Sequence, residues 1–214
     1  MNKKLYAFGC SYTYGHGLED CIVGEVEPAK VPSQLGYANI VGEAINRDVL
    51  NLSDCGSSNK QITHHVKSMY KKINSDDAVI CQWSFMDRYM IFDTNSHNNI
   101  EKLGPWIDTK PSKSYYKFIH TDLDCITMTS WYINFTDLMI KSRGTTKVLH
   151  TLPPVLDYSH MVMLRELIDD TVVCTEDCLT QHHIDTALDN NHPGQKSHNE
   201  FAESLLSEYG NFLK

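Results

Sequence analysis

A serine near the start of the chain has the surroundings of a nucleophile. Ser11 lies between Gly9 and Gly15, directly after the short apolar stretch at residues 5–8. Serine attacks poorly unless a base within hydrogen-bond reach takes its proton. A tight turn from strand to helix at this point would expose the hydroxyl. Ser11 is therefore a candidate nucleophile, provided that the fold brings a base to it.

Asp189 and His192, near the other end of the chain, supply a matching base and orienting group. On one helical turn, positions three apart share a face. We therefore expect the carboxylate to hold one imidazole nitrogen while the other nitrogen faces Ser11. Pro193 and Gly194 would fix the local backbone. The spacing predicts a Ser-His-Asp triad.

Apolar segments alternate with segments of helical period along the chain. Strands are expected at residues 5–8, 48–52, 78–83 and 147–152, with a weak fifth at 171–174. Helices are expected at residues 37–45, 60–72, 112–141 (broken near Asp122 or Thr129) and 200–213, with an irregular excursion at 19–33. This order predicts an α/β fold, a parallel sheet of about five strands covered by helices on both sides. No repeat or linker interrupts it, so residues 1–214 are predicted to form one domain.

Polar, small-residue segments fall where ligands bind in such sheets. In open parallel sheets, that place is beyond the carboxyl ends of the strands. Residues 9–17, 54–59 and 83–88 follow the first three expected strands, and residues 189–194 precede the last helix. We expect these four segments to meet and form the site.

The motifs resemble those of the SGNH (GDSL-like) hydrolases. Residues 9–15, Gly-Cys-Ser-Tyr-Thr-Tyr-Gly, are similar to the first block of that family, Gly-Asp-Ser-x-x-x-Gly. Asp189-x-x-His192, followed by Pro193, resembles the last block, and Gly56 stands where the second-block glycine is expected. The resemblance implies a flavodoxin-like three-layer α/β/α sandwich and metal-independent hydrolysis of lipid, sugar or small acyl esters. The short loops and missing leader look similar to bacteriophage-encoded members.

The chain departs from the family pattern at two places. Cys10 replaces the aspartate beside the nucleophile, and we expect it to be buried and structural. The alternative that Cys10 attacks is less favoured, since a catalytic thiol needs an exposed, thiolate-stabilising site. The third block should read Gly-x-Asn, whose asparagine donates to the oxyanion, but residues 82–88 contain no asparagine. Loss of one such donor typically costs ~10²–10³ in rate.

Other donors could take the place of that asparagine. The candidates are the backbone N–H groups of Ser11 and Gly56, together with the side chain of Asn59. Asn59 either fills the gap or caps the helix that starts there. Ser84 and Arg88 are candidates for lining the pocket or binding a polar leaving group. The plainer alternatives are a surface ion pair for Arg88 and a helix cap for Ser11.

The amino-acid composition limits the classes of binding partner, the location and the cofactors to be expected. The net charge of -8 argues against nucleic acid or an anionic membrane, which require a basic face. Seven cysteines, an odd number without a secretory signal, predict free thiols and a cytoplasmic location, with virion association left open. No metal or cofactor is expected. The pairs His64–His65 and His182–His183 do not share a helical face, and Cys174-x-x-x-Cys178 lacks a second half.

The hypothesis at this stage is a serine esterase. It would remove a short acyl group, such as acetyl, from a small molecule or a carbohydrate, a guess that rests on the family resemblance. Two alternatives remain: a binding protein that keeps the fold but has lost turnover, and an acyltransferase that uses an alcohol in place of water.

Overall fold

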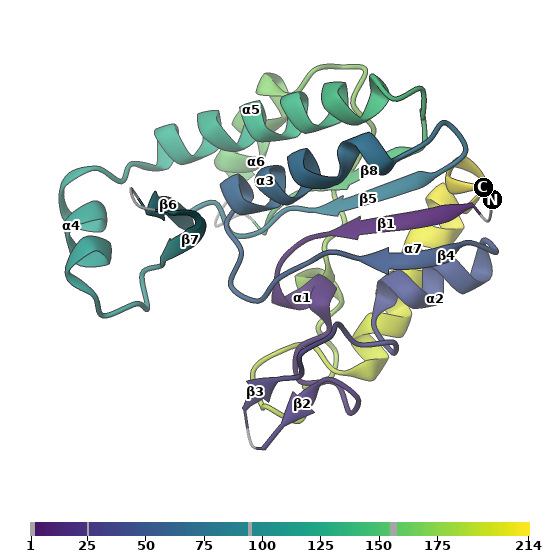
Figure 1. The fold of residues 1–214 in the computed structure, drawn as a ribbon, viewed down its shortest axis with the longest axis horizontal. Helices are drawn as coiled ribbons and strands as arrows, with labels where there is room; N and C mark the ends of the chain where they lie inside the picture. Colours follow the sequence, from purple (N-terminus) through teal and green to yellow (C-terminus); the bar gives the residue numbers. More distant parts are fainter. Residues whose placement is uncertain (1–2, 25, 94–95, 155–157) are drawn as a thin grey trace.

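A five-stranded parallel sheet runs through the middle of the protein (Figure 1). The computed structural model describes residues 3–24, 26–93, 96–154 and 158–214. The strand order is β4-β1-β5-β8-β9, and every neighbouring pair is parallel. The strands are β1 (Lys4–Phe8), β4 (Asp48–Asn51), β5 (Ala78–Gln82), β8 (Val148–Thr151) and β9 (Cys174–Thr175). The predicted α/β fold with about five parallel strands is confirmed.

Helices cover both faces of this sheet. One layer consists of α2 (Tyr37–Ala44) and α7 (Gln195–Leu213), which pack on each other. The other consists of α3 (Asn59–Met69) and α5 (Asp122–Lys141), with α6 (Tyr158–Leu167) packed on α5. The result is the expected three-layer α/β/α sandwich. No helix within the described ranges is both long and apolar enough to cross a membrane.

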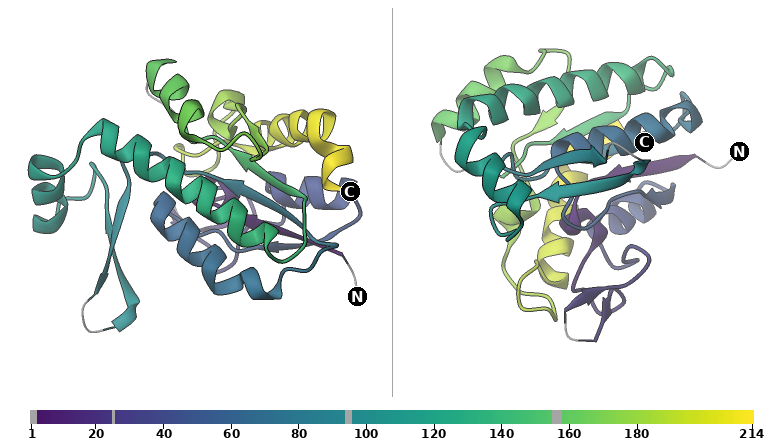
Figure 2. Two further views of the ribbon diagram at one scale, coloured as in Figure 1. Left: turned by 90° about the horizontal axis from the view of Figure 1, so that it is seen from above. Right: turned by 60° about the vertical axis from the view of Figure 1, so that its left-hand side comes forward.

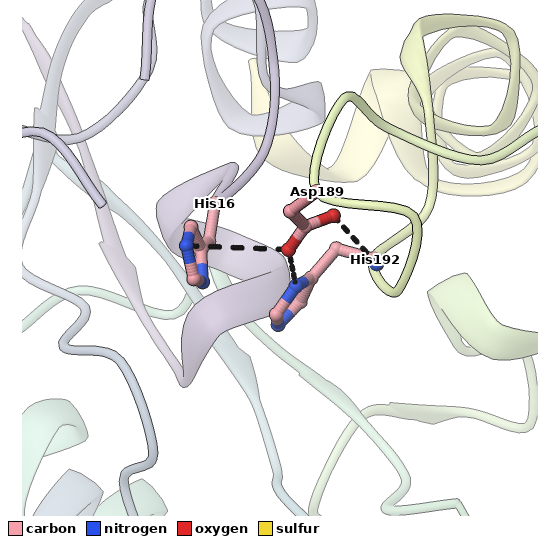
Figure 3. Close-up of side chains that lie close together, drawn as sticks. All are labelled: His16, Asp189 and His192. Carbon is pink, nitrogen blue, oxygen red and sulfur yellow. Dashed lines mark hydrogen bonds and ion pairs between the residues drawn. The ribbon is translucent and has the colours of Figure 1, made fainter. Parts of the chain in front are cut away.

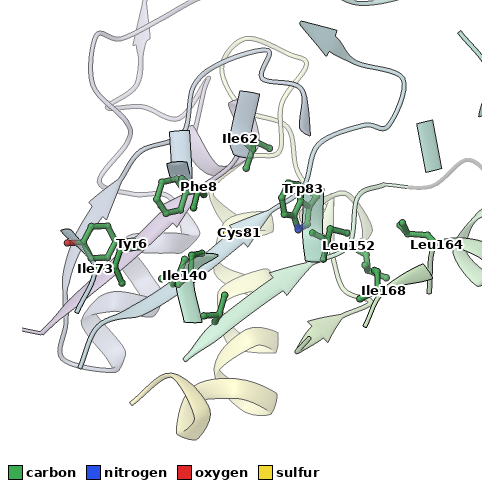
Figure 4. Packing of buried hydrophobic residues seen from close by; sticks show 14 of the residues in the cluster. Tyr6, Phe8, Ile62, Ile73, Cys81, Trp83, Ile140, Leu152, Leu164 and Ile168 are labelled. Carbon is green, nitrogen blue, oxygen red and sulfur yellow. The ribbon is translucent and has the colours of Figure 1, made fainter. Parts of the chain in front are cut away.

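Strand β1 shows why its sequence has no polar face. Leu5 and Ala7 belong to the hydrophobic cluster under α2 and α7, whereas Tyr6 and Phe8 belong to the cluster under α3 and α5 (Figure 4). Successive side chains of a strand point to opposite faces. All four are buried, because a central parallel strand is covered on both sides. The core therefore holds the carboxyl end of β1 firmly in place.

An arm projects from the carboxyl edge of the sheet (Figures 1 and 2). It consists of an antiparallel hairpin, β6 (Tyr89–Asp93) and β7 (Ser96–Leu103), followed by α4 (Lys110–Phe118). Lys60 Nζ donates to the carbonyl oxygen of Met90 at 3.2 Å and so joins α3 to the hairpin. The sequence predicted no hairpin here, since the polar residues 94–99 leave only a short apolar alternation.

Several predicted boundaries need correction. The single helix expected at residues 112–141 is two helices, α4 and α5, separated at residues 119–121 near the break expected at Asp122. The weak fifth strand, expected at residues 171–174, is the two-residue β9 and shares only Cys174 with that range. Helix α7 begins at Gln195, earlier than residue 200. The remaining elements are α1 (Ser11–Tyr14), β2 (Ile22–Val23), β3 (Glu27–Pro28) and the 3-10 helices η1 (Tyr70–Lys72) and η2 (Leu179–His182).

Candidate active site

Ser11 lies at the first position of α1, immediately beyond the carboxyl end of β1. The turn between them requires glycine, because a Cβ on Gly9 would lie 2.0 Å from Thr13 Oγ1. The residue before the helix is Cys10, so the alternative that Ser11 caps α1 is wrong. Cys10 itself is 2% exposed, which confirms that it is buried. Ser11 is 5% exposed.

Side chains from β4 and β5, the two strands that flank β1, hold α1 against the sheet. Thr13 Oγ1 donates to Gln82 Oε1 at 2.6 Å, and Asn51 Nδ2 donates to the carbonyl oxygen of Thr13 at 2.7 Å. Gln82 ends β5 and Asn51 ends β4. The Ser11 turn is therefore fixed at the carboxyl edge, where parallel sheets bind ligands.

Asp189 and His192 form the predicted pair, although they do not lie on a helical turn. His192 Nδ1 donates to Asp189 Oδ2 at 2.5 Å, and the backbone N–H of His192 donates to Asp189 Oδ1 at 3.1 Å. Their loop is closed by a bridge between Thr186 and Pro193. Asn190 has a φ of 56°, in the left-handed region that ends any helix. A carboxylate-capped turn thus produces the contact that we expected from helical spacing.

The loop of Asp189 packs against the segment that carries Ser11 (Figure 3). The His192 ring meets the Tyr12 ring edge-on at 5.6 Å between centroids, and the His16 ring lies at 4.5 Å. A Cβ on Gly17, whose φ is 87°, would lie 2.6 Å from Asp189 Oδ1. The fold therefore places His192 beside the residue that follows Ser11.

The two reactive atoms have no hydrogen-bond partner among the described residues. This holds for Ser11 Oγ and for His192 Nε2, and no direct bond joins them. Because a carboxylate only accepts, the proton on the His192 ring sits on Nδ1. That tautomer leaves Nε2 with a free lone pair. In unliganded enzymes the bond from nucleophile to base is often long and tightens with substrate.

Burial and Asp189 shift the pKa of His192 in opposite directions. Burial lowers the pKa of His192 below its ordinary value, and the hydrogen bond that its ring donates to Asp189 opposes this effect without cancelling it. For Asp189, burial raises the pKa, but the N–H and ring donors of His192 outweigh it, so the pKa lies below the ordinary value. The pair is thus an ionised carboxylate beside a neutral imidazole near pH 7, the state that a general base needs.

His16 is a residue that sequence reasoning missed. Its Nε2 lies 4.0 Å from Asp189 Oδ2 and 2.9 Å from the carbonyl oxygen of Val26. His16, Asp189 and His192 have ligand-type atoms within 4.8 Å of one another, a group that could hold a metal ion. A cation would first have to displace the bonds to Val26 and within the Asp189–His192 pair. The signal available in the sequence was a histidine between two glycines, Gly15 and Gly17, directly after the nucleophile turn.

The loop of Gly56 lies next to the Ser11 turn. The backbone N–H of Asp54 donates to the carbonyl oxygen of Gly9 at 3.3 Å, and Gly56 has a φ of 73° that favours glycine. Lys102, from β7 of the arm, donates to Asp54 Oδ2 at 2.8 Å and to the carbonyl oxygen of Cys55. Sequence reasoning missed Lys102, since only the hairpin brings it here.

Asn59 is not the helix cap, which corrects one of its two alternatives. Ser58 caps α3 by accepting the N–H of Gln61. Asn59 is 3% exposed, and its amide is fully used. Nδ2 donates to the Ser84 carbonyl oxygen at 3.1 Å and to Thr129 Oγ1 at 3.2 Å, while Oδ1 accepts the Ser84 N–H at 2.7 Å. Asn59 clamps the backbone after β5, and both of its N–H groups are occupied.

Arg88 does not form the surface ion pair considered above. No carboxylate among the described residues pairs with it; its Nη1 donates to Ser84 Oγ at 3.1 Å. Its guanidinium lies 4.6 Å from the Phe85 ring and 4.8 Å from the Trp106 ring. Ser84 is buried, so its hydroxyl holds the Arg88 guanidinium from the protein side.

Solved structures with the same fold are esterases and lipolytic proteins. An acetyl xylan esterase from Butyrivibrio proteoclasticus superposes with a TM-score of 0.62 at 14% identity, covering 98% of this chain and 64% of that one. A putative lipolytic protein of the G-D-S-L family from Desulfitobacterium hafniense gives 0.56 at 10%, covering 99% and 100%. The aryl esterase of M. smegmatis gives 0.57 at 14%, covering 99% and 100%.

These likenesses concern the fold. No family model matches the chain, and no curated protein sequence matches it. The chain spans about two thirds of the acetyl xylan esterase, the full length of which is therefore not represented here. At identities of 14% and below, the function has to be argued from the residues of this chain.

Proposed function

We propose that this protein is a serine hydrolase of acyl esters, with Ser11 as nucleophile, His192 as general base and Asp189 as the group that orients it. The observation that carries the proposal is the hydrogen bond of 2.5 Å from His192 Nδ1 to Asp189. It fixes the tautomer whose Nε2 can accept a proton. The ring stands beside Tyr12, the neighbour of Ser11 in α1.

The reaction would follow acyl transfer to serine. His192 Nε2 takes the proton of Ser11 as Oγ attacks the ester carbonyl carbon. The tetrahedral intermediate collapses by breaking the bond to the alcohol oxygen, which leaves with the proton from His192. Water then gives a proton to His192 as its oxygen attacks the acyl-serine carbonyl carbon. The second tetrahedral intermediate collapses by breaking the bond to Ser11 Oγ, which takes the proton back from His192 as the acid is released.

The backbone N–H groups of Ser11 and Gly56 are the proposed donors to the oxyanion. The hydrogen bond between Asp54 and Gly9 supports this pairing, because it ties the two loops together. Asn59 would donate only if it gave up a bond to Ser84 or Thr129. We expect modest turnover, since a missing donor costs ~10²–10³ in rate.

The proposed substrate is a short acyl ester, acetyl above all, on a small molecule or a carbohydrate. The fold neighbours include an acetyl xylan esterase and an aryl esterase. The test is a panel of 4-nitrophenyl esters with acyl chains of two to eight carbons, given to the wild type and to Ser11→Ala. Hydrolysis above background by the wild type alone supports the proposal. Equal rates for both proteins across the panel contradict it.

A second candidate function is a binding protein that keeps the fold without turnover. The occupied amide of Asn59 favours it, since the one asparagine considered for the oxyanion already uses both of its N–H groups. A fluorophosphonate probe separates the two functions. Covalent labelling that disappears in Ser11→Ala supports the hydrolase, whereas an unlabelled, folded wild type supports the binding protein.

A further inference from the structure

No carboxylate among the described residues compensates the positive charge of the Arg88 guanidinium. An arginine stays charged at any physiological pH. Its Nη1 bonds to a neutral hydroxyl, Ser84 Oγ, and its Nε is buried without a partner. The adjacent Asp87 makes no ion pair with it, nor does any other carboxylate in the described part of the chain. Such a charge is available to a ligand.

Arg88 is also held in one orientation before any ligand arrives. Phe85 and Trp106 each present a ring within 5 Å of the guanidinium carbon, at 4.6 and 4.8 Å. Ser84 fixes one edge of the group, and Asn59 in turn clamps the Ser84 backbone. The two rings and Ser84 restrict the guanidinium, whose remaining N–H groups can donate to a carboxylate.

This charge lies beside the candidate catalytic pair. The Phe85 ring, on which Arg88 stacks, meets the Tyr12 ring at 6.1 Å, and Tyr12 meets His192 at 5.6 Å. Consistent with this position, the charge of Arg88 contributes to lowering the pKa of His192, after burial and together with His16. A group bound at Arg88 would therefore belong to the molecule being hydrolysed at Ser11.

An exposed tryptophan near this charge, Trp106, lies at a surface cavity. Trp106 is 57% exposed and lines a surface cavity of about 510 Å³ together with Tyr116, Lys113 and Lys117. Lys113 pairs with Asp108, which belongs to the same lining. An exposed indole offers a flat apolar surface with a polar edge. Aromatic surface next to a fixed cation suits a sugar ring that carries a negative charge.

We propose that Arg88 and Trp106 form a recognition site for a carboxylate-bearing sugar, so that the ester substrate is an acylated acidic carbohydrate. This inference rests on the proposed function for its link to hydrolysis, but the binding site stands apart from turnover. The carboxylate would bind the guanidinium edge, and the sugar ring would lie against the exposed indole.

Binding can be measured without an ester. Isothermal titration calorimetry would compare methyl glucuronoside with methyl glucoside, which differ at C6 by carboxylate against hydroxymethyl. We expect saturable binding of the glucuronoside alone, weakened at least tenfold in Arg88→Gln and less in Arg88→Lys. The matched control is Lys71→Gln, an exposed charge on η1. A change in tryptophan fluorescence that is lost in Trp106→Phe would locate the ligand. Equal binding of both sugars, or unchanged binding in Arg88→Gln with a native circular dichroism spectrum, overturns the proposal.

Steady-state kinetics on two esters supply the second test. Acetylated methyl glucuronoside and acetylated methyl glucoside are compared by kcat/KM, and we expect the ratio between them to fall at least tenfold in Arg88→Gln. Loss of kcat by the same factor for both esters would place Arg88 at the oxyanion and overturn the proposal. Glucuronoside binding without hydrolysis of any ester would contradict the proposed function and leave the anion site standing. Hydrolysis without a preference for the acidic sugar would support the proposed function and contradict the anion site.

Discussion

Two of the histidine–aspartate pairs in the protein have different surroundings. His192 and Asp189 lie in a loop at the carboxyl edge, with a 2.5 Å bond between Nδ1 and the carboxylate. His150 and Asp137 lie in the core; His150 is 0% exposed, and its Nε2 is 3.4 Å from Asp137 Oδ1 without hydrogen-bond alignment.

The second nitrogen of each ring makes the difference. His150 Nδ1 accepts from Trp83 Nε1 at 3.1 Å, and the two rings stack with an angle of 8° between their planes. Both of its nitrogens are thereby directed at protein groups. His192 Nε2 has no partner within the described residues. A histidine beside an aspartate is therefore a candidate base only if the fold leaves one nitrogen open to a ligand.

The largest expected effect comes from removing the nucleophile at the open pair. Ser11→Ala should lower kcat by about 10⁶-fold if the triad behaves as others do, with thermal unfolding unchanged. Steady-state kinetics on the best ester of the panel measure the loss. The matched control is Ser142→Ala, an exposed serine beyond α5. Residual activity above one tenth of wild type would remove Ser11 from the mechanism.

Asp189→Asn should have the next largest effect. An asparagine amide in place of the carboxylate favours the wrong tautomer of His192, and in triads this change costs about 10⁴-fold in kcat. Kinetics and circular dichroism are measured on the same preparation. The comparison is sharpened by Asp137→Asn, which we expect to reduce stability and to leave kcat within about threefold. If the two variants lose activity equally while folded, the distinction between the pairs fails.

His150→Phe should affect stability and spare catalysis. The buried Trp83 N–H would lose its acceptor, and an unsatisfied buried donor costs ~1–3 kcal/mol. Urea unfolding followed by fluorescence measures the change in the free energy of unfolding. For His192→Phe we expect a change below ~1 kcal/mol, because its side chain keeps 12% exposure and Asp189 keeps the backbone N–H donors of Asn191 and His192. A loss of catalysis in folded His150→Phe comparable to that of His192→Phe would contradict the prediction.

The smallest effect concerns titration. Burial lowers the pKa of both His192 and His150. Each ring should therefore take up its second proton only at a pH below the ordinary pKa of histidine. The activity limb that reports His192 should therefore rise with pH at a pH below that of free histidine, because the neutral ring is the base. Arg88→Gln removes a positive charge that disfavours protonation, so the His192 pKa should rise. NMR titration of the ring protons checks both directions, and a downward shift in Arg88→Gln would show the electrostatic picture to be wrong.

The sequence identified the core fold because its signals are local. The apolar run of β1 and the period of α7 each reflect burial of neighbouring residues. The pairing of Asp189 with His192 was also predicted, but for an incorrect reason, since an aspartate-capped turn and a helix bring the same two positions together. Spacing alone does not distinguish these two geometries.

The features that the sequence did not reveal depend on contacts between distant segments. Arg88 was a candidate for lining the pocket, with a surface ion pair as the alternative, yet its contact with Trp106 arises only after β6 and β7 turn the chain back. The role of Asn59 was missed for a similar reason, because its partners Ser84 and Thr129 come from the segment after β5 and from α5. Polar side chains satisfy one another across such junctions, and no periodicity records it.

The contact of Lys102 with Asp54 and Cys55 has a consequence for redesign. The hairpin and α4 form a projecting arm that could be exchanged to alter the proposed substrate preference. However, this lysine fastens the arm to the glycine loop beneath it. A transplanted arm without an ammonium at that position would release the loop. Chimeras should therefore carry over this lysine, or replace Asp54 at the same time.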